Sequence, residues 1–295
     1  MSQTFTVRTP DGVDLLVRDW PLAAGATCRG SALIVHGVGE HSGRYEHVAA
    51  CLTEMGLAVR CHDQRGFGQS GGPKGLLPKE DALIYDAKMI YDASAADAAS
   101  RGDHMPPFLI GHSMGGGVAA RAVTGKWITP RGLVLSSPGI EPLLTPVQRA
   151  LALTANLVAP NLQRPHGIDP ETLTHDPDVV AAIRRDPLMH DRVTPRLVVS
   201  MINNGKRALG DAPMLRVPTL LLVAGDDKVV VANASRTFAE RTPPGTCELH
   251  LYDGLFHEVF NERQPDRVRV FGDLRRWVLA QLADRRYHGS SPGDG

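Results

Sequence analysis

The sequence has no run of roughly 18 or more consecutive apolar residues, the length that a membrane-spanning helix requires. Its first ten residues also lack the charged and apolar regions of a secretory leader. Both absences argue against a membrane-spanning or exported protein. We therefore expect the chain to reside in the cytoplasm.

The sequence also has no excess of positive or negative charge, since Lys plus Arg and Asp plus Glu each number 32. This balance gives no basic surface for nucleic acid and indicates a neutral partner. The four cysteines show no C-x-x-C spacing, which argues against a zinc, redox or haem site. They are Cys28, Cys51, Cys61 and Cys247, and we expect reduced, mostly buried thiols. No metal or cofactor is expected.

A chain of 295 residues that is 42% hydrophobic can bury a substantial core in one or two domains. Apolar and polar residues alternate at 4–8 and 13–20, on either side of a Pro-Asp-Gly turn. This pattern predicts an antiparallel hairpin. Short apolar runs then follow, most of them separated by helical stretches. They cover residues 31–36, 57–61, 108–110, 132–136 and 219–224. Residues 247–252 are predicted to form the last strand and residues 265–283 the closing helix. This order predicts an α/β fold whose mostly parallel sheet has helices on both faces.

Residues 139–213 interrupt this alternation of strands and helices, because they contain no apolar run typical of a strand. They hold two helix-like stretches, at 147–158 and 193–207. An insertion at the carboxyl end of a parallel sheet, where ligands bind in open α/β folds, indicates a cap. The predicted organisation is a core of residues 1–138 and 214–285, a helical cap at 139–213, and a flexible Gly/Ser/Pro-rich tail at 286–295.

The strand-helix junction Gly111-His112-Ser113-Met114-Gly115 carries the G-x-S-x-G pattern of a nucleophile elbow. A tight turn there exposes the serine hydroxyl, and the glycines remove side chains that would collide. The pattern occurs a second time around Ser70. That copy lies in a segment whose composition is typical of a loop, and no helix follows it. Ser113 is therefore the predicted nucleophile.

The acid and the base of such a site follow the nucleophile on loops after late strands. Two carboxylates, Asp226 and Asp227, come directly after the strand at 219–224, and either could orient a histidine. Asp227 fits better, while Asp226 could cap the helix expected near residue 231. Of the 12 histidines, His257 lies in the loop between the last strand and the last helix and is the predicted base.

An oxyanion hole needs two backbone N–H donors. The residue after the nucleophile, Met114, supplies one, and the loop His36-Gly37-Val38-Gly39 supplies the other through Val38. A metal site formed by His36, Glu40 and His41 is the weaker interpretation of the same loop.

Candidates for substrate contact are Glu40 and Arg44 in this loop, and Leu151 and Leu157 on the expected cap helix. That helix places Val147, Leu151, Leu157 and Val158 near one face. The simpler interpretation is that this face packs inside the cap. The alternative is an exposed lid that accepts an acyl chain or touches lipid aggregates or a membrane surface.

Several motifs together resemble the monoacylglycerol lipase branch of the α/β-hydrolases, also called lysophospholipase-like or serine aminopeptidase-like hydrolases. They are H-G-x-G-E-H-S-G-R-Y from His36, D-Q-R-G-F-G-x-S-G-G from Asp63, G-H-S-M-G-G from Gly111, Asp186-Pro187-Leu188, and Y-x-G-x-x-H-E-x-x-N-E from Tyr252. The resemblance covers nearly the whole chain. It implies a triad of Ser113, Asp227 and His257, an oxyanion hole at Val38 and Met114, and a mobile cap. In the acid loop the family pattern Gly-x-x-Asp is replaced by Gly-x-Asp.

The expected activity is hydrolysis of monoacylglycerols or similar single-chain esters through an acyl-enzyme, with a small ester or lipid as partner. Alternatives on the same fold are a lysophospholipase, a short- or medium-chain esterase, an aminopeptidase or a cofactor-free perhydrolase. A non-catalytic binding module is disfavoured because all three triad residues are present.

Overall fold

The computed structural model of the protein describes residues 2–284, so the predicted tail at 286–295 lies outside the described residues. One eight-stranded sheet runs in the order β1-β2-β4-β3-β5-β6-β9-β10. The hairpin and the β2-β4 pair are antiparallel, and the other pairs are parallel. The strands are β1 (Gln3–Arg8), β2 (Asp14–Trp20), β3 (Gly30–Val35), β4 (Leu57–His62), β5 (Phe108–His112), β6 (Leu133–Ser136), β9 (Thr219–Ala224) and β10 (Cys247–Tyr252).

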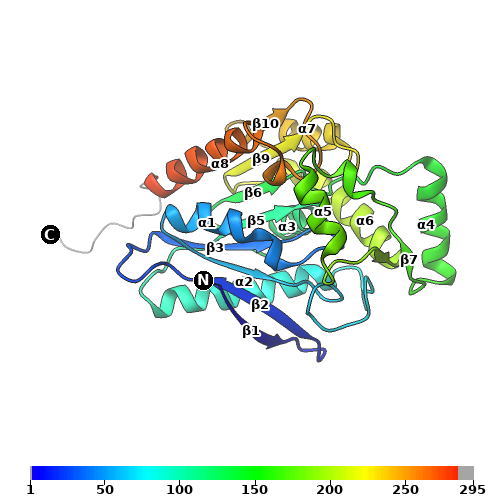
Figure 1. The fold of residues 1–295 in the computed structure, drawn as a ribbon, viewed down its shortest axis with the longest axis horizontal. Helices are drawn as coiled ribbons and strands as arrows, with labels where there is room; N and C mark the ends of the chain where they lie inside the picture. Colours follow the sequence, from blue (N-terminus) through cyan, green and yellow to red (C-terminus); the bar gives the residue numbers. More distant parts are fainter. Residues whose placement is uncertain (1, 285–295) are drawn as a thin grey trace.

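Helices cover both faces of this sheet, so the predicted α/β fold is confirmed (Figure 1). Helices α1 (Glu46–Glu54) and α8 (Asp266–Ala283) lie on one face. Helices α2 (Ala82–Ser100), α3 (Ser113–Thr124) and α7 (Ala232–Arg241) lie on the other. Short 3-10 turns, η1 (Ser42–Tyr45) and η4 (Val259–Asn261), stand in the loops before α1 and α8.

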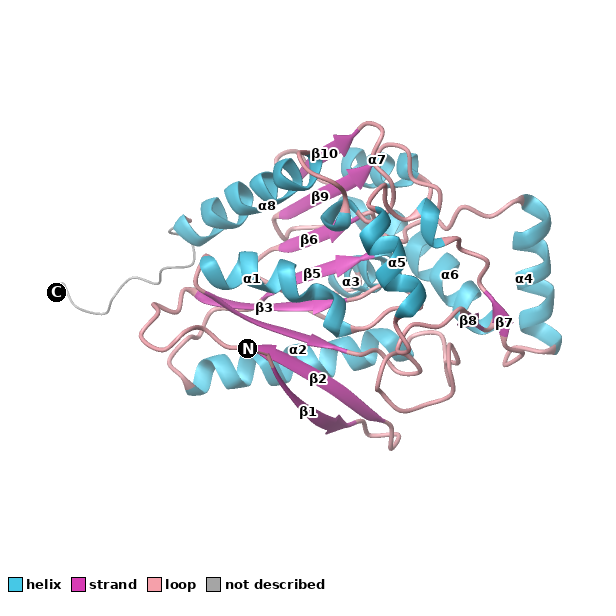
Figure 2. Ribbon diagram, viewed as in Figure 1, coloured by secondary structure: helices cyan, strands magenta, loops and turns pink. Residues whose placement is uncertain are grey.

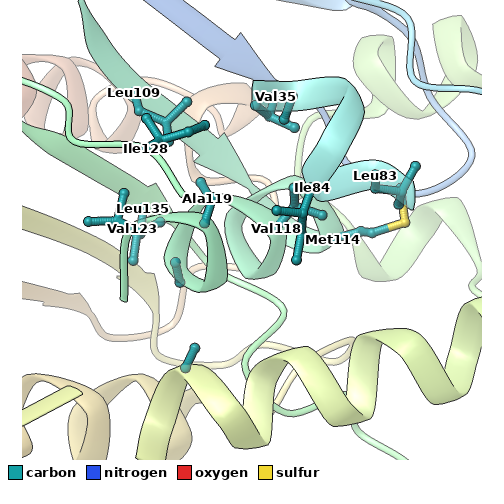
Figure 3. Close-up of a cluster of buried hydrophobic side chains, with 14 of the residues drawn as sticks. Val35, Leu83, Ile84, Leu109, Met114, Val118, Ala119, Val123, Ile128 and Leu135 are labelled. Atoms are coloured by element: carbon teal, nitrogen blue, oxygen red, sulfur yellow. The ribbon is translucent and has the colours of Figure 1, made fainter. Parts of the chain in front are cut away.

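Strand side chains point alternately to the two faces and build two apolar clusters. In the cluster drawn in Figure 3, Val35, Leu109 and Leu135 of the sheet lie near Ala119 of α3. The side chain of Met114 reaches toward Leu83 of α2 in the same view. The residue after Ser113 is therefore anchored in the core by its side chain.

Between β6 and β9 lies the inserted segment, residues 137–218, at the end of the sheet to which the parallel strands point (Figure 2). Both helices expected there are present, as α4 and α6. The short helix α5 and the two-residue strands β7 and β8 were not predicted. The elements are α4 (Pro146–Val158), β7 (Arg164–Pro165), η2 (Pro170–Thr172), α5 (Pro177–Arg185), β8 (Arg192–Val193), α6 (Pro195–Asp211) and η3 (Ala212–Met214).

Helix α4 stands farthest from the sheet and packs against α6 (Figure 2). Thr145 and Gln148 form a capping box at its start, which fixes where the helix begins. None of its residues is buried, and the Leu157 side chain is 83% exposed. The simpler interpretation of its apolar face, packing inside the cap, is therefore wrong: the face is open to solvent.

The four cysteine side chains differ in their exposure. Cys51 and Cys61 are buried, Cys247 is half-buried and Cys28 is exposed, so only two of the four free thiols lie in the core as expected. Among the helices described between residues 2 and 284, none has both the length and the apolar character needed to cross a membrane.

Candidate active site

The turn from β5 into α3 holds Ser113 in a left-handed conformation, with a φ of 53°. Few residues other than glycine adopt this φ, and such strain is typical of functional sites. A side chain at position 115 could not fit, because a Cβ there would lie 2.1 Å from the carbonyl oxygen of Val35. Gly111 is equally restricted, since its Cβ would lie 2.5 Å from the oxygen of Gly115.

Three side chains from distant parts of the chain form one hydrogen-bonded line. His257 Nε2 lies 2.8 Å from Ser113 Oγ, and His257 Nδ1 lies 2.7 Å from Asp227 Oδ2. Asp227 also accepts hydrogen bonds from the backbone N–H groups of Val229 and Val230 through Oδ1. Burial opposes ionisation of this carboxyl, but His257 and these two donors outweigh it and lower its pKa. Asp227 is thus an oriented, ionised partner for the imidazole.

Asp226 and Ser70, the alternative candidates for the acid and the nucleophile, lie outside this hydrogen-bonded line. Asp226 is half exposed and pairs with Lys228. Ser70 donates to the backbone oxygen of Asp63 and accepts from the N–H of Leu16, so its hydroxyl ties the loop to β2. The structure therefore brings together the predicted serine, acid and base and leaves both alternatives outside.

The loop after β3 passes directly over Ser113. A Cβ on Gly37 would lie 3.1 Å from the Cβ of Ser113 and 2.8 Å from Glu40 Oε1, so the loop approaches this closely only with glycine. The buried Glu40 carboxylate accepts from Gly37 N–H and from the Tyr45 hydroxyl. Val38, one of the two predicted oxyanion donors, lines the cavity beside Ser113.

The other predicted donor, Met114, is the second residue of α3 and is buried. Its N–H belongs to the first turn, where helix N–H groups have no partner within the helix. The positive end of the α3 dipole thus lies at Ser113.

An ion-pair chain links this loop to the loop of His257. Arg44 binds Glu40 Oε2 at 2.7 Å and both carboxylate oxygens of Glu258 at 2.8 and 2.7 Å. Burial opposes the charge on these carboxyls, but Arg44 lowers the pKa of both Glu40 and Glu258. Glu40 and Arg44, predicted as substrate contacts, line the cavity but are occupied with each other and with Glu258.

The sequence predicts no role for Glu258, although this residue directly follows the predicted base His257. Its partner Arg44 lies 214 positions away along the chain. Glu258 belongs to the motif H-E-x-x-N-E, but that motif does not indicate which residue pairs with it.

A cavity of about 280 Å³ opens at Ser113 and His257. Its wall includes polar residues of the inserted segment and an apolar set that sequence reasoning missed: Ile168, Leu173, Ile183, Met189 and Val229. Leu151 and Leu157, the predicted contacts on α4, are not among the residues that line it. The cavity thus combines the Ser113 hydroxyl, the loop after β3 and an apolar wall.

The inserted segment is also hydrogen-bonded to the loop after β3. His41 Nε2 lies 2.8 Å from Asp186 Oδ2, and His190 N–H donates to the oxygen of Gly39. His36 instead accepts from the Gln64 N–H, so His36, Glu40 and His41 each face a different partner. Within residues 2–284, no group of three acidic, histidine or cysteine side chains is arranged to hold a metal ion.

A mostly parallel sheet with a serine elbow, a histidine and an acid at its carboxyl edge defines an α/β-hydrolase, and the chain is a serine hydrolase. Residues 26–264 match the family described as serine aminopeptidase, S33, and the chain belongs to that family. The resemblance to its monoacylglycerol lipase branch is confirmed.

Three similar proteins illustrate the relationship. A monoacylglycerol lipase of Mycolicibacterium smegmatis is 31% identical over 260 residues, which cover 86% of this chain and 89% of that protein. An uncharacterized abhydrolase domain-containing protein of Dictyostelium discoideum is 31% identical over 98% of this chain, but the chain spans only 30% of its length. The solved structure of Paleococcus ferrophilus monoacylglycerol lipase has a TM-score of 0.80 and 29% identity, over 90% of this chain and 99% of that one.

Proposed function

We propose that this chain hydrolyses carboxylic esters with a single acyl chain, foremost monoacylglycerols, through the triad of Ser113, His257 and Asp227. The observation that carries the proposal is the hydrogen-bonded line of 2.8 and 2.7 Å that ends at the cavity. The similarity to monoacylglycerol lipases over most of their length supports the substrate class.

In this mechanism His257 Nε2 takes the proton of Ser113 Oγ as the oxygen attacks the ester carbonyl. The oxyanion that forms is held by the N–H groups of Val38 and Met114, a contribution of about 3 kcal/mol per donor. His257 returns the proton to the leaving alcohol, and an acyl-serine remains. Water deprotonated by His257 then releases the fatty acid and restores Ser113.

Residues 139–213 act as the cap in this proposal, over a core formed by 1–138 and 214–285. The apolar cavity wall desolvates the start of one acyl chain, at roughly 0.8 kcal/mol per buried methylene. Leu151 and Leu157 lie outside the cavity, so their role is contact with the rest of a long chain, or with a lipid aggregate that presents it. Cytoplasmic residence stays a prediction.

A substrate panel tests this function. Purified protein is assayed on p-nitrophenyl esters of increasing chain length, a monoacylglycerol, a lysophospholipid, triolein and a peptide amide. We expect kcat/KM to rise with chain length up to medium chains, high activity on monoacylglycerol and little on triolein. Preference for the lysophospholipid would change the proposed head group of the substrate from glycerol to a phosphorylated one. Faster cleavage of the amide than of every ester would contradict ester hydrolysis.

A further inference from the structure

A second carboxylate, Glu262, lies beside the loop of His257 without belonging to the triad. It is only 1% exposed. Its Oε1 accepts the N–H of Phe256 at 2.8 Å, and Phe256 is the residue directly before His257. A hydrogen bond to that peptide group fixes the backbone from which the catalytic imidazole projects.

The same carboxylate binds the inserted segment. His175 Nδ1 lies 2.9 Å from Glu262 Oε1, and the His175 N–H donates to Oε2 at 3.0 Å. The His175 ring also stacks on the Phe256 ring, with 3.7 Å between centroids. One buried group therefore joins the segment over the site to the residue before His257.

Neighbouring bonds strengthen this junction. Glu258 N–H donates to the oxygen of Leu173 at 2.8 Å, and Thr174 Oγ1 donates to the oxygen of Asn261 at 2.7 Å. The short stretch 173–175 thus runs along the loop that carries His257 and contacts it on both sides of that residue. A shift of this stretch would move the loop with it.

A buried carboxylate is costly unless its oxygens are well bonded. In the described part of the chain, the ion-pair partner of Glu262 within 4 Å is His175, not a lysine or arginine. An apolar side chain at this position would leave the Phe256 and His175 N–H groups without an acceptor. The carboxylate therefore stays buried because it accepts several N–H bonds at one point.

We propose that Glu262 is a positioning residue for the reaction: through the Phe256 N–H it holds His257 in reach of Ser113, and through His175 it makes that position depend on the inserted segment. This inference rests on the proposed function. Because a misplacement of about 1 Å can cost roughly a hundredfold in rate, loss of the Phe256 bond acts on kcat.

The test compares three variants with the wild-type protein on p-nitrophenyl acetate and butyrate. Glu262→Ala removes all the bonds, and Glu262→Gln keeps a carbonyl oxygen that can accept the Phe256 N–H. Asp86→Asn is the matched control, because Asp86 is also a buried acid but pairs with Arg65 away from the site. Thermal melting shows how much each change destabilises the fold.

We expect kcat of Glu262→Ala to fall roughly ten- to a hundredfold, with KM changed less than about twofold because no substrate contact is lost. Glu262→Gln should recover most of kcat. Asp86→Asn should lower the melting temperature and leave kcat and KM in place.

Two results would overturn the inference. One is a Glu262→Ala protein with wild-type kcat, and the other is a kcat loss no larger than that of the Asp86→Asn control. If Glu262→Ala does not fold, His175→Phe replaces it: the ring stack stays, the Nδ1 bond is lost, and an unchanged kcat contradicts the coupling. A wild-type protein that cleaves no ester would instead overturn the proposed function itself.

Discussion

At the scale of single residues, neighbours of the same type have different surroundings in this molecule. Asp227 is buried against His257, whereas Asp226, one position earlier, pairs with Lys228 at the surface. Ser113 faces an imidazole, whereas Ser70 bonds only to backbone. The chemistry of each residue follows from these contacts and not from its type.

The acid provides the sharpest residue-scale prediction. Asp227→Asn should lower kcat by roughly 10⁴-fold, because an amide favours the wrong tautomer of the histidine. Asp226→Asn removes only a surface ion pair and should change kcat less than about twofold. Steady-state kinetics on one p-nitrophenyl ester compare the two, and equal losses would refute the choice of Asp227.

The sequence predicts Ser113, Asp227 and His257 because each follows a strand end, and strand ends of a parallel sheet share one edge. It does not predict the partners of Glu258 and Glu262. Those bonds join residues far apart in the chain, such as Arg44 and Glu258 at 2.7 Å. No local pattern encodes which distant side chain a carboxylate will meet.

At the scale of elements, strands were easier to predict than the inserted segment. Strands β9 and β10 have the predicted bounds. Strand β9 is a continuous apolar run, which is typical of strands buried on both faces, whereas the apolar residues of β10 alternate with polar ones. Helix α5 was missed because it has nine residues and buries only Val180 and Ile183. Two buried positions are too few to establish a helical period.

The elbow between β5 and α3 gives a prediction at this scale. Gly115→Ala should destabilise the protein by about 3 kcal/mol or more, the upper range for overpacking, because its Cβ would meet the oxygen of Val35. The control is Gly272→Ala in α8, where a Cβ meets nothing within 4 Å. That change should raise stability by up to about 1 kcal/mol. Urea denaturation measures both, and a well-tolerated Gly115→Ala would contradict the packing described.

Helix α4 provides a second element-scale prediction. Leu157→Asp should change the free energy of unfolding by less than about 0.5 kcal/mol, because the side chain is 83% exposed. It should raise KM for long-chain esters more than for acetate, because the charge would remove the contact with long chains that we propose for this face. Val268→Asp on α8, also exposed, is the control and should change neither KM. Equal effects of Leu157→Asp on short and long esters would exclude a substrate contact at α4.

At the scale of the whole molecule, buried histidines make stability depend on pH. Burial lowers the pKa of His62 to about 3 and of His112 to about 4, from an ordinary value of 6.5. Between pH 6.5 and about 4.5 the unfolded chain binds protons at these imidazoles and the folded chain binds few. Stability is therefore lost as the pH falls, by about 2 kcal/mol per histidine between pH 6.5 and 5.

The variant His62→Leu cannot titrate at this position and should lose correspondingly less stability over the same pH range. His104→Gln, at an exposed position, should behave like the wild-type protein. Urea denaturation at pH 7, 6 and 5 gives the three slopes. Identical slopes for His62→Leu and wild type would show that burial of this imidazole does not set the acid sensitivity.

We propose Ser113 as the nucleophile that His257 and Asp227 activate. The most direct test of this role is reaction with a fluorophosphonate probe, followed by mass spectrometry of the intact protein and its peptides. We predict one adduct, located on Ser113, that is absent in Ser113→Ala and unchanged in Ser70→Ala. An adduct on Ser70, or persistent labelling of Ser113→Ala, would contradict the assignment of Ser113 as the nucleophile.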